Sequence, residues 1–530
     1  MRPRNRILAL AAAAAVAAGA AALSPLSATA TTTTADESAV RKDGIGLTFL
    51  GRYSSGSFDE SAAEITAYDA DSRRLFTVNA KTGTVDILDL SDPARPRKTG
   101  ELATPGANSV AVHKGLVAVA QQAAEKTDPG TVSFFRAADG AKVRTVTVGA
   151  LPDMVTFTPD GRQAVVANEG EPDSYCDGTA DPAGSVSVID VARGTVRTAG
   201  FEKWDGKEDE LRAAGVRITG PGASASQDLE PEYVAVSANS RTAWVTLQEN
   251  NALAVVDLKH AKVRKITPLG LKDHSLPGNA LDPSDKDGGV NIAQWPVQGM
   301  YQPDSIAAFT SGGGQYTVSA NEGDAREYDC YEEEVRVKNL ELSPAAFPNA
   351  AELKQDAALG RLKVTSASPR DAEGRVTELH AFGGRSFSVR DAGGALVWDS
   401  GDDLERLTAR LNPAHFNSTN SKNDFDSRST AKGPEPEGIT TGTVDGTPYA
   451  FVGLERVGGI VAYDLSDPHR PKFAAHISTR DFTGDPAAGT AGDLAPEGLS
   501  FIPAVDSPNG RPLLVVGHEV SGTTAVYQVG

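Results

Sequence analysis

Carboxylates recur at two fixed places in a repeating pattern. One place directly follows a proline and opens an apolar strand, as in "LPDMVTF" and "EPEGITT". The other lies at the end of the next strand, as in "VVANEG" and "FVGLER". Carboxylate oxygens are the ligands that Ca²⁺ prefers in proteins. If they meet in space, the pattern predicts a calcium site at Asp153, Glu169, Glu232, Glu249, Asp304, Glu322, Glu437, Glu455, Glu497 and Glu519.

The repeat that carries these acids consists of short apolar strands separated by Gly, Asp-Pro and Asp-Gly turns, which is an all-β pattern. Repetition at this spacing favours one single seven-bladed β-propeller. Two separate all-β domains are the rival architecture, but no Pro/Ser-rich linker divides the repeats. We expect 46–53 to pair in the last blade. The seven units are 62–90, 107–137, 151–190, 230–258, 302–323 (resuming at 384–392), 435–465 and 495–529.

The two carboxylate positions belong on one face of such a propeller. The first strand of a blade runs outward from its start and the second runs back, so the start of one and the end of the other share a channel mouth. The first unit has Glu64 and Asn79 at these positions, and the second has Ser109 and Gln121. We therefore expect a double ring of acids that is weakest in the first two blades.

So many converging acids cannot all ionise unpaired at low cost. A bound cation, raised pKa values or basic partners would relieve them. Two interpretations stay open at this point: a metal site, or a salt-bridge network that orders the loops. The basic side chains within or next to the same loops are Arg326, Arg428, Lys432 and Arg456.

Two long loops leave this face after the related stretches "VVANEGEPDSYC" and "VSANEGDAREYDC". Each stretch ends in a cysteine, and Cys176 and Cys330 are the only two in the chain. In an exported protein this predicts a disulfide, and two sulfurs alone make a poor metal site. Two segments, about 191–229 and 324–383, are too long to be turns and are loop insertions on the mouth face. The first contains a short helical candidate.

The N-terminal residues and the charge of the chain lead us to expect an extracellular protein. Residues 1–30 have a basic start, an apolar stretch and "ATA", as in a signal peptide. Residues 31–45 are expected to be a disordered leader and 46–530 the propeller. No later segment reaches the roughly 18 apolar residues of a membrane span. The net charge of −19 argues against nucleic-acid binding. We expect a secreted monomer with an unknown extracellular ligand.

Patterns of well-known catalytic sites are absent from the sequence. There is no Gly-x-Ser-x-Gly nucleophile elbow, no P-loop and no dinucleotide fingerprint. No His/Cys spacing indicates zinc. Of the eight histidines only His518, next to Glu519, is expected near the ring.

Three stretches together resemble the choice-of-anchor I domain family: "ANEG" after a Pro-Asp strand, 416–439 ("FNSTNSKNDFDSRSTAKGPEPEGI") and 495–529. The resemblance implies an extracellular bacterial β-propeller related to animal mesenchyme-specific cell-surface glycoproteins. Members often carry a surface anchor, and this chain ends without one, so we expect a released form.

Two functions follow from these observations. The first is a binding scaffold whose acidic mouth holds calcium. The second comes from the alkaline-phosphatase label that family members often carry: a metal-dependent phosphoesterase at the same mouth. In that case a cation would activate water and phosphate would contact Arg326, Arg428, Lys432 and Arg456. We favour the scaffold, because the sequence contains no recognisable nucleophile or base.

Overall fold

The computed structural model describes residues 40–41, 44–176 and 178–530. The expected signal peptide, 1–30, lies outside these residues, and so does most of the expected leader. The range 31–45 is not wholly a disordered leader, however. Its strand β1 (Val40–Arg41) pairs with β33 (Lys472–Ile477), and Ile45 is buried in the core.

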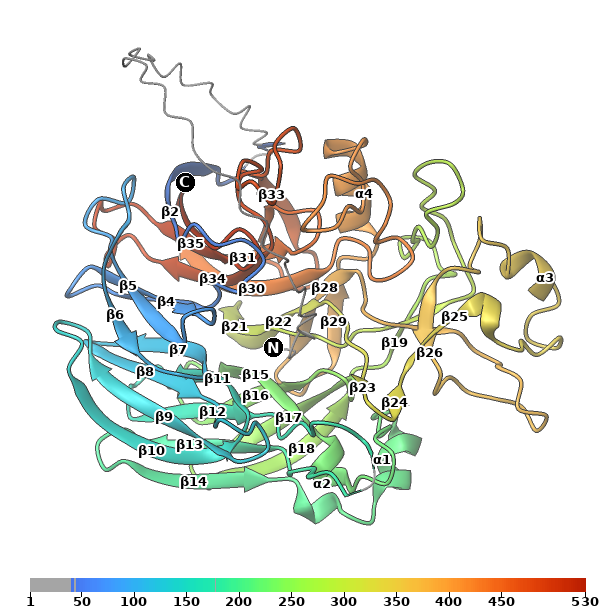
Figure 1. The fold of residues 1–530 in the computed structure, drawn as a ribbon, viewed down its shortest axis with the longest axis horizontal. Coiled ribbons are helices and arrows are strands. Elements are labelled where there is room, and N and C mark those ends of the chain that lie inside the picture. Colours follow the sequence, from blue (N-terminus) through green and yellow to red (C-terminus); the bar gives the residue numbers. More distant parts are fainter. Residues whose placement is uncertain (1–39, 42–43, 177) are drawn as a thin grey trace, which may run out of the picture.

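Seven antiparallel sheets, each built on four strands, make up most of the chain (Figure 1). The first sheet consists of β3 (Thr66–Asp69), β4 (Arg74–Asn79), β5 (Thr84–Asp89) and β6 (Arg97–Ala103). The second consists of β7 (Ala107–His113), β8 (Leu116–Gln121), β9 (Pro129–Arg136) and β10 (Lys142–Ala150). The third consists of β11 (Pro152–Phe157), β12 (Gln163–Asn168), β13 (Ser185–Asp190) and β14 (Thr195–Gly200). The fourth sheet consists of β15 (Pro231–Val236), β16 (Thr242–Leu247), β17 (Ala252–Asp257) and β18 (Lys262–Pro268). The fifth consists of β21 (Ile306–Ser311), β22 (Gly314–Asn321), β28 (Ser386–Asp391) and β29 (Leu396–Asp399). The sixth sheet consists of β30 (Pro436–Val444), β31 (Thr447–Leu454), β32 (Ile460–Asp464) and β33, and β1 pairs with β33 at its edge. The seventh consists of β34 (Pro496–Ile502), β35 (Leu513–His518), β36 (Thr523–Val529) and β2 (Leu47–Ser54).

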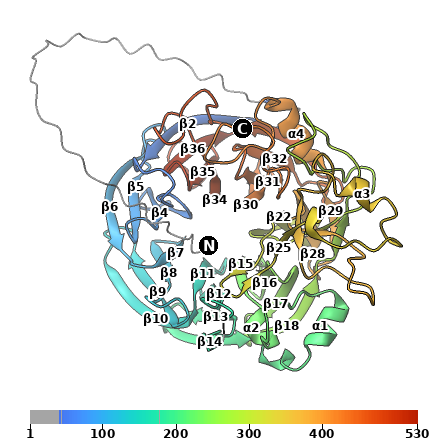
Figure 2. The same ribbon diagram turned by 45° about the vertical axis from the view of Figure 1, so that its right-hand side comes forward.

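The sheets are arranged around a central axis (Figure 2). The first strands contact one another in chain order from β3 to β34, and β34 contacts β3. Strand β2 pairs with β36 from Leu47–Val529 to Ser54–Thr523, so the predicted pairing of 46–53 in the last sheet is confirmed. The fold is therefore all-β and propeller-like.

Apolar side chains between neighbouring sheets form the core. Val165 and Val188 of the third sheet and Val245 of the fourth belong to one buried cluster. Phe201 and Leu211 close this cluster from the insertion after β14. Burying apolar area in this way is the dominant favourable term in folding, and it fixes each sheet against the next.

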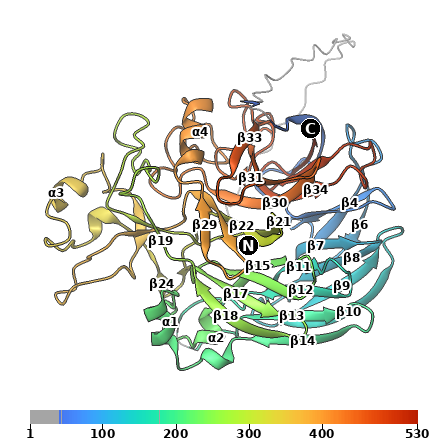
Figure 3. The same ribbon diagram turned by 180° about the vertical axis from the view of Figure 1, so that it is seen from behind.

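Short helices and a further sheet fill the long connections. The segment 191–229 contains η1 (Glu202–Trp204), α1 (Glu208–Ala214) and α2 (Ala225–Asp228), so the helical candidate is present. A five-stranded sheet projects from one side of the ring (Figure 3). It orders β19 (Leu271–Asp273), β20 (Gln298–Met300), β27 (His380–Ala381), β26 (Lys363–Thr365) and β25 (Glu334–Arg336). The remaining elements are β23 (Glu327–Tyr328), β24 (Tyr331–Glu332), η2 (Val337–Asn339), α3 (Ala350–Leu353) and α4 (Asp403–Leu411). No described helix is long and apolar enough to cross a membrane.

The predicted disulfide between Cys176 and Cys330 is confirmed, with a sulfur–sulfur distance of 2.01 Å. It joins the two related loops. The ring of Tyr175 lies between those of Tyr328 and Tyr331, with centroid distances of 5.3 and 5.4 Å. The loops are thus held together by a covalent bond and an aromatic cluster.

Replacing both cysteines with serine should lower the free energy of unfolding by about 2–4 kcal/mol, the usual range for a native disulfide. The bond spans 154 residues, so its loss frees a long loop in the unfolded chain. Chemical denaturation followed by circular dichroism measures the change. Wild-type protein in reductant should match the double variant, and an unchanged midpoint in both would contradict the expectation.

Candidate functional site

Four of the acids that open the inner strands lie at β-bulges. Pairing of the first two strands shifts register directly after Pro152, Pro231, Pro436 and Pro496. A bulge leaves residues of one strand unpaired and redirects a side chain. The residue that follows each of these prolines is Asp153, Glu232, Glu437 and Glu497. The repeated Pro-acid pair is thus a device that turns a carboxylate out of the sheet.

The backbone before these acids adopts an unusual conformation in four of the sheets. The residue before the proline has a positive φ: Leu151 at 44°, Gln302 at 41°, Glu435 at 49° and Ala495 at 60°. Such conformations cost energy for residues other than glycine. Their repetition at this mouth indicates that the position of the acids outweighs local backbone preference.

Glycines let the acids of neighbouring sheets approach one another. A Cβ at Gly438 would lie 1.8 Å from the carbonyl oxygen of Glu497. A Cβ at Gly498 or Gly517 would lie 2.6 or 1.9 Å from that of Glu64. The glycine in the repeated "PEG" is therefore needed for close packing around the mouth.

The acids converge on a cavity of about 380 Å³. It is lined by Ser61, Glu64, Glu232, Gln248, Asp304, Glu322, Asp324, Lys432, Glu437, Glu455, Arg456, Glu497 and Glu519. Asp153, Glu169 and Glu249 of the predicted ligand set are not in its lining. They are near it, because the charges of Glu249 and Glu169 help raise the pKa of Glu232, after burial as the main cause. Asp153 acts in the same way on the pKa of Asp304.

One side of the mouth is neutralised by basic side chains around Glu435. This fully buried glutamate accepts hydrogen bonds from Arg428 (Nε–Oε1 2.6 Å) and Arg456 (Nε–Oε2 2.7 Å). The ammonium group of Lys432 pairs with Glu322 and lies 3.4 Å from Glu435 Oε2. Burial favours the protonated form of Glu435, but these three cations outweigh it and hold its pKa well below the usual range.

Glu435 is the functional residue that sequence reasoning missed. Its signal was present, because it directly precedes Pro436 in "GPEPEGI". The repeat predicts a role for the acid that follows the proline, whereas Glu435 precedes the proline.

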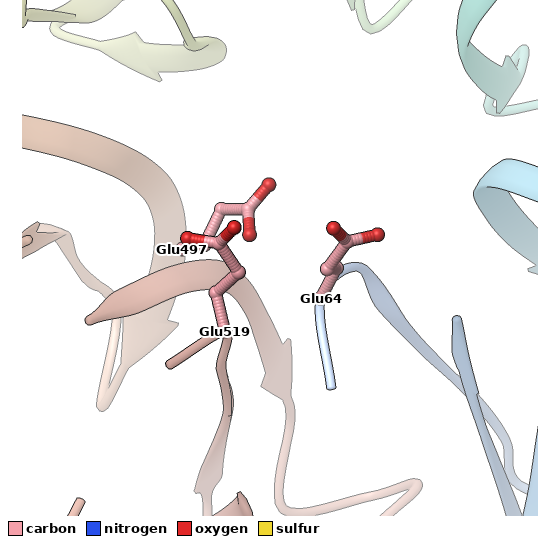
Figure 4. A group of neighbouring side chains, drawn as sticks. All are labelled: Glu64, Glu497 and Glu519. Atoms are coloured by element: carbon pink, nitrogen blue, oxygen red, sulfur yellow. The ribbon is translucent and has the colours of Figure 1, made fainter. Parts of the chain in front are cut away.

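The other side of the mouth is a cluster of three carboxylates. Oxygen atoms of Glu64, Glu497 and Glu519 all lie within 4.8 Å of one another. Figure 4 shows Glu64, just before β3, facing Glu497 of β34 and Glu519, just after β35. Within the described part of the chain, no Lys or Arg forms an ion pair with Glu64 or Glu497. The side chain of Ser61 donates a hydrogen bond to Glu519 Oε1 at 2.8 Å.

The electrostatics of this cluster differ from those around Glu435. Burial, and then the charges of the neighbouring glutamates, raise the pKa of both Glu64 and Glu497 well above the usual value. Glu64 is only 3% exposed, and its Oε2 has no hydrogen-bond partner among the residues described. The cluster is therefore a concentration of negative charge that a cation would stabilise.

The predicted anion-contact residues are each bound to carboxylates. Arg326 is buried away from the cavity lining, where Nη1 lies 3.1 Å from Asp228 Oδ1 and Nη2 lies 2.8 Å from Glu230 Oε2. Arg428, Lys432 and Arg456 surround Glu435. His518 is buried and is not part of the lining. This arrangement gives phosphate binding by these four residues no support.

The chain also matches the model of a known family. The model of the choice-of-anchor I domain matches residues 64–468, and the chain belongs to this family. Among curated proteins it resembles Gigasin-3a of Magallana gigas, with 32% identity over 192 residues, 33% of this chain and 66% of that protein. It also resembles the mesenchyme-specific cell surface glycoprotein of Strongylocentrotus purpuratus, with 28% identity over 56% of this chain and 42% of that protein. The chain thus spans less than two thirds of either relative.

Solved structures that align over most of the chain are distant in sequence. The hydrazine synthase of Kuenenia stuttgartiensis aligns over 90% of this chain and 99% of its own, with 13% identity and a TM-score of 0.47. The streptogramin B lyase aligns over 92% and 98%, with 9% identity and a TM-score of 0.45.

Proposed function

We propose that this protein is an extracellular binding scaffold, a single seven-bladed propeller whose acidic mouth holds a divalent cation. The seven four-stranded sheets and the contacts that run from β3 round to β34 and back support the blade count. The observation that carries the cation site is the cluster of Glu64, Glu497 and Glu519, with oxygens within 4.8 Å of one another on an open cavity.

Calcium is the ion that this ligand set fits best. All the ligands are carboxylate oxygens, which select hard cations. Ca²⁺ takes six to eight oxygens in flexible geometry, whereas Mg²⁺ demands a near-ideal octahedron. Three carboxylates leave coordination positions open toward the cavity. A ligand with an anionic group would complete the shell, and this makes the mouth a binding site.

Three observations support an extracellular location. One relative is named as a cell surface glycoprotein. The name of the family refers to an anchor. The disulfide suits an oxidising compartment. The phosphoesterase alternative is not proposed, because the basic residues it needs are bound to carboxylates.

Calcium should raise the melting temperature of the purified protein, and a chelator should lower it. An ion that binds only the native state stabilises it by about 2.7 kcal/mol when its free concentration is 100 times Kd. Magnesium at the same concentration should act more weakly. The Glu64→Gln/Glu497→Gln variant should respond less than wild type. A wild-type melting temperature that is equal in calcium and in chelator would refute the site.

The rise in melting temperature that calcium causes should be larger at higher pH. The folded-state pKa values of Glu64 and Glu497 are raised above 4.5. Without a cation, the stability they contribute is present below pH 4.5 and is lost as pH rises through the folded pKa. Calcium binds the ionised form, so its stabilising effect should be small at pH 5 and larger at pH 8. Calcium titrations of the melting temperature at both values test this, and an equal or reversed effect would contradict it.

A further inference from the structure

A second carboxylate cluster lies outside the mouth. Oxygens of Asp282, Asp287 and Asp426 all lie within 4.8 Å of one another. The first two residues belong to the connection between β19 and β20, and the third to the segment between α4 and β30. The cluster therefore joins two loops that are far apart in the sequence.

The partners of these three acids are hydrogen-bond donors without charge. The backbone N–H groups of Ser284 (3.3 Å) and Asn291 (2.5 Å) donate to Asp282. The N–H of Gly289 donates to Asp287 at 3.5 Å, and the hydroxyl of Ser429 donates to Asp426 at 2.5 Å.

The nearby basic side chains are used elsewhere. Arg361 and Lys286 both pair with Asp285. Among the residues described, no Lys or Arg pairs with a member of the cluster.

A fourth, fully buried carboxylate adjoins the cluster. Glu405 Oε1 accepts hydrogen bonds from the backbone N of Asp282 (3.2 Å), Arg385 Nη1 (2.7 Å) and Asn417 Nδ2 (3.0 Å). Its Oε2 has no hydrogen-bond partner within the described residues, although Glu405 is 0% exposed. Asp287 Oδ2 is also buried without such a partner.

The amide oxygen of Asn417, near the cluster, is also buried without a hydrogen-bond partner among the described residues. Asn417 donates to the hydroxyl of Ser429, which in turn donates to Asp426, so the amide is two contacts from the cluster. Its Oδ1 is buried, and the described residues provide no hydrogen-bond donor for it. Buried polar atoms are nearly always partnered, and leaving several unpartnered oxygens together is costly.

We propose that Asp282, Asp287 and Asp426 bind a second calcium ion, next to the unpartnered oxygens of Glu405 and Asn417. All of these donors are hard oxygens, as Ca²⁺ requires. The ion would tie the β19–β20 connection to the segment that carries Arg428, Lys432 and Glu435 into the mouth. Its role would be to fix the neutralised side of the mouth. The inference uses residues separate from the mouth cluster and stands or falls independently of it.

Isothermal titration of the chelator-stripped full-length protein with calcium tests the inference. Wild type should bind two ions, whereas Asp287→Asn should bind one, or bind the second at least tenfold more weakly. Asp287 is partly exposed and accepts a single long hydrogen bond from Gly289, so this variant should fold. Asp285→Asn, two residues away, is the matched control and should keep both ions.

The outcomes separate the two sites. If Asp287→Asn binds calcium as wild type does, the second site does not exist. If Asp285→Asn and Asp287→Asn lose the ion equally, the effect is not specific to the cluster and the inference fails. If only the mouth proposal fails, wild type binds one ion, Glu64→Gln/Glu497→Gln is unchanged, and Asp287→Asn abolishes binding.

Discussion

Replacing Glu435 with glutamine should lower the free energy of unfolding by about 3–5 kcal/mol, the cost of breaking a buried ion pair. Glu435 is fully buried, and it is the acid that Arg428, Lys432 and Arg456 share. Glutamine keeps the shape and removes the charge, so three largely buried cations lose their common partner. Urea denaturation followed by circular dichroism measures the loss.

Glu373→Gln is the control for this variant. Glu373 also pairs with an arginine, but its side chain is 64% exposed, and exposed pairs contribute little. Its unfolding midpoint should match wild type. Equal midpoints for wild type and Glu435→Gln would show that the basic residues are not held by this acid, and the division of the mouth into two sides would be wrong.

The second large effect is expected at Arg326. Its guanidinium is fully buried between Asp228 and Glu230. Arg326→Met preserves most of the volume but leaves two buried carboxylates without their cation, so we expect a loss of about 3–5 kcal/mol. The loss should be smaller at pH 5 than at pH 8, because burial raises the pKa of Glu230 and protonation at low pH then removes its uncompensated charge.

Thermal unfolding at both pH values measures this second effect. Arg97→Met, whose side chain is 76% exposed and pairs with Asp89, should change the melting temperature little at either pH. An Arg326→Met variant as stable as wild type at pH 8 would show that Arg326 is dispensable for the loops beside the mouth.

The repeat made much of the fold predictable. Alternating strands, the Pro-acid pairs and the two "NEG" turns are local patterns, and local patterns specify local structure. Positions that recur in every unit must be equivalent in space, which is why the acids could be placed on one face. The disulfide followed from the same logic, because Cys176 and Cys330 occupy matching positions after matching turns.

The partners of each acid could not be predicted, because long-range packing decides them. Arg326 lies in the loop after "NEG", as a mouth residue would, yet its partners come from the segment around α2, 96 and 98 residues earlier. The connection 271–300 showed no repeat, and its place in the projecting sheet depends on pairing with β27. Glu435 lies two residues from Glu437, but its three cations meet only in the folded chain.

The most direct test of the central claim compares two glutamates of the same cavity, Glu497 and Glu455. Both line it, and both belong to groups of three carboxylates with oxygens within 4.8 Å of one another. Glu455 lies 3.0 Å from Arg456, whereas no described Lys or Arg pairs with Glu497. The measurement is calcium titration by calorimetry in an Asp287→Asn background, which removes the second site. The account predicts that Glu497→Gln weakens the remaining site at least tenfold and that Glu455→Gln leaves it within about twofold. Equal affinities in both variants would contradict it.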